Sequence, residues 1–292
     1  MKIIVFGGAG FLGSHVCDKL SDAGYEVVVF DKTESPWIKN DQEMIIGDIL
    51  DKDCVEKAIE GAKYIFNFAG LADIDEAKSR PVETIQYNIL GNAVILNACV
   101  KYNIKRYIFA STVYVYSKSG GFYRCSKQSC ESYIEEYYHS FNQEYTILRF
   151  GSLYGPRAKE NNAIYSFVKQ AIKDNKIIYS SGSQDALREY IHVEDAAKSC
   201  VEILKPEYNN QHIILTGHQP MRVGDLFKMI SEILGKNIEI VVNPDNSSIH
   251  YEITPYSFIP KTGQKLTPQT HIDLGQGLLR IVEDFYNVYQ AE

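Results

Sequence analysis

The sequence predicts an α/β fold: a doubly wound parallel sheet covered by helices on both faces, together with a smaller mixed α/β lobe towards the C-terminus. Short, apolar, β-rich runs alternate with segments of helical spacing through the first two thirds of the chain, which is typical of parallel strands joined by crossover helices. A glycine-rich turn follows the first run directly. With 292 residues, 45% of them hydrophobic, the chain is long enough for two lobes that pack closely together.

Strands and helices alternate in order up to residue 150. The strands are short and rich in β-branched and aromatic residues, and they are predicted at Lys2–Phe6, Glu26–Phe30, Met44–Gly47, Tyr64–Asn67, Arg106–Ala110 and Tyr145–Phe150. The helices repeat apolar residues every three or four positions, and they are predicted at Phe11–Ala23, Asp51–Ile59, Pro81–Tyr102 and Tyr123–Phe141.

The pattern becomes irregular after Phe150. Gly151–Arg157 is predicted as a loop, and the later elements are predicted at Ala163–Lys173, Tyr190–Leu204, His212–Thr216, Val223–Leu234, Ile238–Val242 and Gly275–Val288. We therefore assign residues 1–152, with 184–217 returning to them, to the sheet domain. Residues 153–183 and 218–292 are assigned to the smaller lobe, where we expect the substrate to bind.

Composition excludes several classes of function. The net charge of −7 and the lack of a lysine or arginine run argue against nucleic-acid binding. No apolar run approaches the roughly 18 to 20 residues that span a bilayer, and the N-terminus does not resemble a signal peptide. The six cysteines lack metal-ligand spacing, so no metal site is indicated. We expect a cytoplasmic protein that does not contact a membrane.

The glycine-rich turn Gly8-x-Gly10-x-x-Gly13 lies between a strand and a helix, which is the context of a dinucleotide-binding site in a Rossmann-like fold. Glycine lets the backbone turn sharply and approach a pyrophosphate, whose charge meets the free N–H groups of the helix. A match of this kind is weak when it stands alone. The residues expected to line the cofactor site here are Gly7, Gly10, Phe11, Leu12 and Gly13.

Asp31 strengthens the prediction because it ends the second strand, 18 residues after Gly13. A carboxylate at this position accepts hydrogen bonds from the adenosine ribose and repels a 2′-phosphate, which favours NAD over NADP, although the neighbouring Lys32 acts in the opposite direction. Asp48, after the third strand, can either reach the adenine or cap the helix Asp51–Ile59.

Tyr123 and Lys127 are four residues apart on a predicted helix, so their side chains share a face. Free tyrosine has a pKa of about 10, and a nearby ammonium can lower that pKa towards the range of a catalytic base. Thr112 follows a strand at the carboxyl edge of the sheet, where its hydroxyl can orient a substrate oxygen or relay a proton. Each residue alone is equally compatible with a structural role.

Together these residues resemble the extended short-chain dehydrogenase/reductase family, particularly its nucleotide-sugar epimerases and dehydratases. Four further segments carry the resemblance in order along nearly the whole chain: Asn67-Phe68-Ala69-Gly70, Ser111-Thr112-Val113-Tyr114-Val115-Tyr116, Leu148–Arg157 and Arg188–Asp195. The resemblance implies an NAD-dependent enzyme that acts on a nucleotide-diphosphate sugar.

The resemblance also implies roles for individual residues. Tyr123 would be the base, Lys127 its activator and a nicotinamide-ribose ligand, and Thr112 the third catalytic residue. Arg188 would grip the substrate diphosphate, and Ser152 occupies a position where relatives often place a phosphate-binding asparagine. The further cofactor-binding residues would be Lys32, Asp48, Ile49, Phe68, Ala69 and Gly70.

The chain departs from the family pattern after Thr112, where Val113 and Tyr114 replace the acidic pair of the sugar dehydratases. Dehydration is therefore disfavoured. The remaining chemistry is hydride and proton exchange at sugar carbon 4, with net 4-epimerisation or net dehydrogenation or reduction as open outcomes. Only ten residues separate Thr112 from Tyr123, which opens the sugar pocket to a larger substrate.

Two further alternatives remain open. A protein of the same fold can bind or sense NAD without turnover, although such proteins usually lose part of the catalytic triad. The apolar stripes on helices Pro81–Tyr102 and Tyr123–Phe141 fit either the homodimer contact of related enzymes or the core of a monomer. We expect a homodimer.

Overall fold

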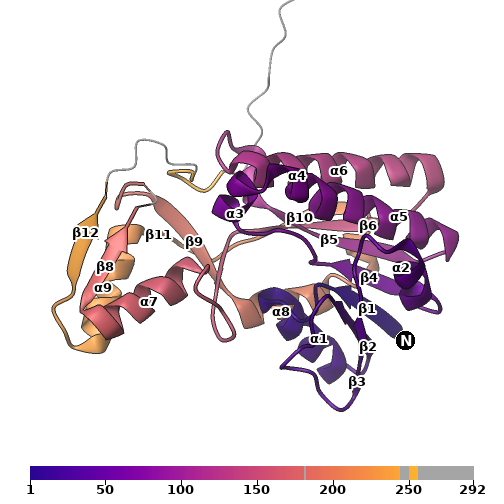
Figure 1. Cartoon of the computed structure of the whole chain (residues 1–292), viewed down its shortest axis with the longest axis horizontal. Helices are drawn as coiled ribbons and strands as arrows, with labels where there is room; N and C mark the ends of the chain where they lie inside the picture. The colour runs from indigo at the N-terminus through magenta and orange to yellow at the C-terminus, as the bar shows by residue number, and fades with distance from the viewer. Residues whose placement is uncertain (181, 244–249, 256–292) are drawn as a thin grey trace, which may run out of the picture. The chain divides into compact units, whose positions relative to one another are not determined.

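A seven-stranded sheet forms the centre of this computed structural model, which describes residues 1–180, 182–243 and 250–255 (Figure 1). In chain order its strands are β1 (Lys2–Phe6), β2 (Glu26–Asp31), β3 (Gln42–Ile46), β4 (Tyr64–Asn67), β5 (Arg106–Thr112), β6 (Tyr145–Phe150) and β10 (Gln211–Leu215). The spatial order is β10-β6-β5-β4-β1-β2-β3, and every neighbouring pair is parallel. This confirms the predicted doubly wound parallel sheet. The strand order reverses between β1 and β4, the point at which such sheets bind ligands.

Alternating side chains of the strands enter two separate cores. In β1, Ile4 and Phe6 belong to one core, whereas Ile3 and Val5 belong to the other. Helices α2 (Lys52–Ile59), α5 (Gly91–Lys101) and α6 (Gly121–Phe141) contribute to the first core, and α1 (Phe11–Asp22) and α8 (Val193–Glu202) contribute to the second. Both faces of the sheet are thus buried, which explains why its strands β1 and β2 each carry four consecutive apolar residues.

The predicted helix Pro81–Tyr102 is interrupted. It consists of α4 (Pro81–Thr84), a π-helical turn at Ile85–Leu90, and α5. A further short helix that the sequence did not predict, α3 (Ile74–Ser79), precedes it and is capped by the Asp73 side chain. Single π-turns inside α-helices are frequently found at functional sites.

The remaining elements form two small sheets with their own helices (Figure 1). The first sheet contains β7 (Ser152–Tyr154), β9 (Leu187–His192) and β11 (Pro220–Arg222), and the second contains β8 (Lys176–Tyr179) and β12 (Glu239–Val242). Helices α7 (Ala163–Asp174) and α9 (Val223–Leu234) pack with β8 in a third core.

The prediction that Gly151–Arg157 is entirely loop is wrong, because β7 lies within it and pairs with β9. Three residues are too few to show a two-residue alternation. The predicted helix Gly275–Val288 lies outside the described residues. Strand β10 does return to the large sheet beside β6, while the domain boundaries assigned above remain a prediction.

Candidate active site

The glycine-rich turn joins β1 to α1 and can form only with glycine at key positions. Gly7 has a φ of +76°, and a Cβ added there would lie 2.6 Å from the backbone nitrogen of Ala69. A Cβ at Gly13 would lie 2.2 Å from the carbonyl oxygen of Gly7. Helix α1 begins at Phe11 and carries no acidic residue in its first turn. The first turn of the helix therefore carries no negative side chain of its own, which suits it to a phosphate group.

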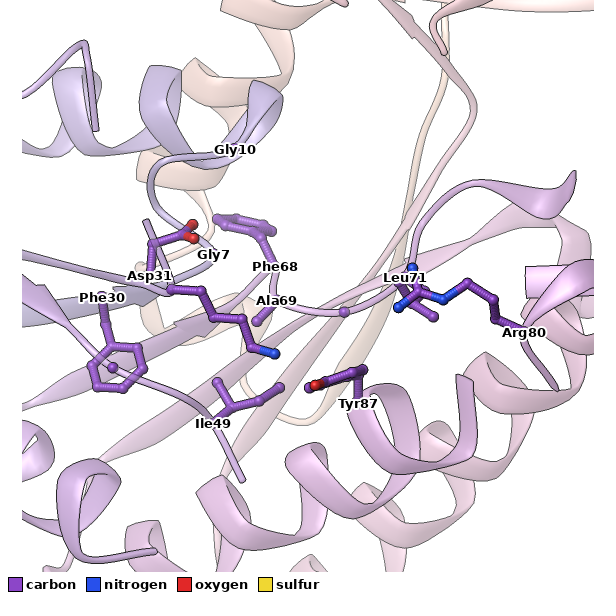
Figure 2. A pocket seen from close by; sticks show the side chains of 13 residues that line it. Gly7, Gly10, Phe30, Asp31, Ile49, Phe68, Ala69, Leu71, Arg80 and Tyr87 are labelled. Atoms are coloured by element: carbon purple, nitrogen blue, oxygen red, sulfur yellow. The ribbon is translucent and has the colours of Figure 1, made fainter. Parts of the chain in front are cut away.

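A cavity of about 380 Å³ opens at this turn. Figure 2 shows side chains from several elements around it, with Asp31 beside the turn and Tyr87 and Arg80 further along the wall. Of the predicted cofactor residues, it is lined by Gly7, Gly10, Asp31, Lys32, Ile49, Phe68, Ala69 and Gly70. The lining residues that the sequence prediction missed are Phe30, Gly47, Leu71, Arg80 and Tyr87. The predicted residues that do not line it are Phe11, Leu12, Gly13, Asp48, Tyr123 and Lys127.

Two charged side chains at the end of β2 enter this cavity. The Asp31 carboxylate accepts a hydrogen bond from the backbone nitrogen of Ala9 at 3.0 Å, which ties β2 to the glycine-rich turn. The Lys32 ammonium lies 3.1 Å from Asp48 Oδ2 and 3.6 Å from the ring centre of Tyr87. Asp48 does not line the cavity itself, but it contacts Lys32, which does.

The two possible roles of Asp48 can now be separated. The N-cap of α2 is Asp51, whose side chain accepts hydrogen bonds from the backbone nitrogens of Asp53 and Cys54, each at 3.1 Å. Asp48 instead accepts a hydrogen bond from the backbone nitrogen of Leu50 at 2.9 Å. It does not cap the helix.

The structure brings Thr112, Tyr123 and Lys127 together at the carboxyl end of β5. Thr112 ends this strand, whereas Tyr123 and Lys127 lie in the first two turns of α6. The Thr112 hydroxyl lies close enough to the Tyr123 phenol to affect the pKa of the phenol. The Lys127 Nζ lies 5.8 Å from the centre of the Tyr123 ring. A hydroxyl, a phenol and an ammonium thus share one small region, as the spacing predicts.

The pKa values of Tyr123 and Lys127 differ from those that the sequence predicts. Burial raises the pKa of Tyr123 to about 12, and the nearby Thr112 hydroxyl only partly opposes this. Burial also lowers the pKa of Lys127 to about 8. The expected lowering of the phenol pKa by Lys127 is therefore wrong for this arrangement. The ammonium donates to the carbonyl oxygen of Ala110 at 2.7 Å and lies 4.5 Å from the centre of the Phe109 ring.

A buried ion pair fixes α6 on the sheet. Glu131 in α6 accepts from Arg149 of β6, with Nη2 and Oε2 2.6 Å apart, and also accepts from the Ser111 hydroxyl of β5. Both charged side chains are at least nine-tenths buried, and such a pair is costly to break. Its geometry sets the position of α6, and hence of Tyr123, relative to Thr112.

Asn88 is a second positioning residue, and sequence reasoning missed it. It lies in the π-helical turn and is 3% exposed. Its side chain accepts from the backbone nitrogen of Leu71 at 2.7 Å and donates to the Leu71 carbonyl at 3.0 Å and to Ser126 Oγ at 2.8 Å. The Ser126 hydroxyl in turn donates to the carbonyl oxygen of Tyr123 at 2.8 Å. Asn88 therefore links the cavity-lining loop after β4 to the helix that carries Tyr123.

Two of the predicted substrate residues, Ser152 and Arg188, lie on the three-stranded sheet, whereas Thr112 lies in β5. Ser152 of β7 is in register with Tyr190 of β9, and Arg188 is two residues earlier in β9. The buried Arg188 guanidinium lies 4.5 Å from the ring centre of Tyr251. The Tyr251 ring packs against Tyr114, with ring centres 4.6 Å apart. These aromatic contacts connect Arg188 to the turn that follows Thr112.

Comparison with known proteins identifies the family of this chain. The family model described as "NAD dependent epimerase/dehydratase family" matches residues 3–216. The chain belongs to this family. Membership in this family confirms the predicted resemblance. It also confirms that the chain is an enzyme of this class and that its cofactor is NAD.

Several relatives of this family member extend over nearly its whole length. A putative UDP-glucose 4-epimerase from Methanocaldococcus jannaschii is 29% identical over 302 residues, which cover 96% of this chain and 97% of the relative. The crystal structure of UDP-glucose 4-epimerase with UDP-glucose from Thermotoga maritima matches with a TM-score of 0.81 and 26% identity, covering 88% of this chain and 90% of the other. A UDP-glucuronic acid decarboxylase from Arabidopsis thaliana is 25% identical over 98% of this chain and 70% of its own length.

The described part of this epimerase/dehydratase family member contains neither a membrane-spanning helix nor a metal-binding cluster. No helix there is long and apolar enough to cross a membrane. Nor do three or more histidine, cysteine, aspartate or glutamate side chains gather there in an arrangement that could hold a metal ion.

Proposed function

We propose that the chain is an NAD-dependent 4-epimerase that inverts carbon 4 of a UDP-linked hexose. The observation that carries this proposal is the convergence of Thr112, Tyr123 and Lys127 at the sheet edge that also carries the dinucleotide cavity. The UDP-glucose 4-epimerase relatives from M. jannaschii and T. maritima support the choice of substrate and reaction.

The residues around the cavity fit NAD. The absence of Cβ atoms at Gly7 and Gly13 leaves the turn close enough to the β4 loop to form a cradle for the pyrophosphate, next to the N-terminus of α1. Asp31 can accept hydrogen bonds from the adenosine ribose hydroxyls. NAD bound there would supply the hydride chemistry: it would accept a hydride from carbon 4 and return it to the opposite face of the same carbon.

The protein side of the reaction is the transfer of one proton at the sugar 4-oxygen. Thr112 orients this oxygen, and Tyr123 accepts the proton when the hydroxyl becomes a ketone. The Lys127 ammonium, which donates to the Ala110 carbonyl oxygen, would hold the nicotinamide ribose. In the return step the raised pKa of Tyr123 favours its protonated form, which donates the proton back. The Arg188 guanidinium would hold the substrate diphosphate.

Dehydration fits the site less well than epimerisation. The two residues after Thr112 are Val113, which is fully buried, and Tyr114, whose hydroxyl is bonded to His250 Nδ1 at 2.7 Å. Burial raises the pKa of the Tyr114 phenol far above neutrality. Neither side chain supplies the carboxyl acid that elimination of a sugar hydroxyl requires.

We also propose that the chain forms a homodimer through α4, the π-helical turn and α6. Val82 and Ile85 are 66% and 55% exposed on the first two, and Phe122 and Tyr133 are 51% and 52% exposed on α6, which packs beside them. Exposed apolar side chains on neighbouring helices are typical of a surface that a second subunit covers. Light scattering of the purified chain measures this directly.

The experiment that tests the proposed function is incubation of the purified chain with UDP-, GDP-, dTDP- and CDP-hexoses. Products are followed by NMR, and reduced nicotinamide is followed by absorbance. An epimerase inverts carbon 4 of a UDP-hexose without accumulating reduced nicotinamide. Stoichiometric reduction of NAD would instead identify a dehydrogenase, and a chain that binds NAD but changes none of these sugars would be a binding protein.

A further inference from the structure

Both cationic side chains that line the dinucleotide cavity are already bonded to carboxylates. The Lys32 ammonium is 3.1 Å from Asp48 Oδ2. The Arg80 guanidinium is bonded to Glu76 and Glu83, on the preceding and following turns of the helical segment. Among the described residues that line the cavity, no other lysine or arginine is present. The cavity therefore does not present an unpaired cation.

This arrangement bears on the phosphate that distinguishes NADP from NAD. A 2′-phosphate carries close to two negative charges, and at the end of β2 it would meet the Asp31 carboxylate. Lys32 is the cation that directly follows Asp31 in the sequence. A free lysine there would attract the phosphate and offset the repulsion from Asp31.

Lys32 is not free in this structure because two groups hold it on the opposite wall. Asp48 neutralises its charge, and the ammonium lies 3.6 Å from the ring centre of Tyr87 in the π-helical turn. Burial lowers the pKa of Lys32, but its interactions with Tyr87 and with the Asp48 carboxylate outweigh this effect and raise the pKa above the ordinary value. Lys32 therefore stays charged, but its charge is paired with Asp48 and is not available to a phosphate on the adenosine ribose.

We propose that Asp48 is a specificity residue: by holding the Lys32 ammonium against Tyr87, it keeps the cofactor site selective for NAD over NADP. Selectivity then depends on two carboxylates with separate tasks. Asp31 repels the 2′-phosphate. Asp48 pairs with the Lys32 ammonium, which would otherwise neutralise the charge of the phosphate. The inference concerns cofactor binding alone and does not depend on which sugar is the substrate.

The test is a fluorescence titration of the full chain with NADH and with NADPH, in the absence of sugar. Asp48→Asn should lower the dissociation constant for NADPH relative to that for NADH by at least about fivefold, the effect of one released charge near solvent. Glu83→Gln is the matched control, because it removes the same charge from Arg80 at the other side of the cavity. It should change the ratio of the two constants much less.

The double variant Asp48→Asn/Lys32→Ala identifies the group responsible. It should lose the gain for NADPH, because the released cation is no longer there. An unchanged ratio in Asp48→Asn, an equal change in Glu83→Gln, or a gain that persists in the double variant would each overturn the proposal. Because sugar is absent from the assay, a failure of the proposed epimerase reaction would not affect these outcomes.

Discussion

Tyr123 is the residue on which the proposed chemistry depends most, and its surroundings could be predicted only in part. The four-residue spacing correctly predicts that Lys127 lies near its ring. The spacing does not reveal burial, which raises the pKa of the phenol to about 12 and lowers that of Lys127 to about 8. Nor does it reveal that the ammonium donates to the Ala110 carbonyl, a contact between α6 and β5.

Replacement of this phenol tests its role directly. Tyr123→Phe should reduce turnover by about 10²- to 10⁴-fold, the usual contribution of a positioned acid or base, and should leave NAD binding nearly unchanged. Tyr138→Phe, further along the same helix and packed against the first core, is the matched control and should retain activity. Turnover and NADH binding of the purified variants are measured side by side. If Tyr123→Phe turns over as fast as the wild type, another group is the base.

At the scale of elements, the long periodic segments were predicted well and the short ones were not. Strands β1, β4 and β6 have the predicted bounds, because each is a short run rich in β-branched and aromatic residues in a sheet buried on both faces. Strand β7, with three residues, and the π-helical turn Ile85–Leu90 carry no periodic signal of their own. They depend on tertiary partners, β9 for the strand and the Leu71 loop for the turn.

The π-helical turn leads to a prediction about Asn88. Asn88→Ala leaves the backbone of Leu71 and the Ser126 hydroxyl without their partner, which should cost about 1–3 kcal/mol of folding stability. It should also weaken NAD binding, because the loop that it holds lines the cavity.

Asn92→Ala serves as the control for that variant. Asn92 is equally buried and accepts a hydrogen bond from the Tyr107 hydroxyl at 2.6 Å, away from the cavity-lining loop. The Asn92→Ala variant should lose folding stability without a matching loss of NAD affinity. Denaturant unfolding and NADH titration of both variants separate the two effects, and equal losses of affinity would show that Asn88 acts only through stability.

At the scale of the whole molecule, the parallel sheet explains why motifs far apart in the sequence meet. The glycine-rich turn follows β1, Asp31 ends β2, and Thr112 ends β5, so all three lie at the carboxyl edge. The alternation of strands and helices in the sequence predicts a parallel sheet, and therefore predicts that these residues meet at one edge of it. Arg80, Tyr87 and Asn88 were missed because they come from helices, whose approach to the cavity depends on side-chain packing across the sheet.

The central claim is that hydride leaves carbon 4 and returns to the same carbon. The most direct measurement uses the UDP-hexose substrate labelled with deuterium at carbon 4, incubated with the chain and NAD and followed by NMR. We predict that the 4-epimer forms with its deuterium retained and that reduced nicotinamide does not accumulate. Loss of the label to solvent, or an oxidised sugar formed together with NADH, would contradict the account.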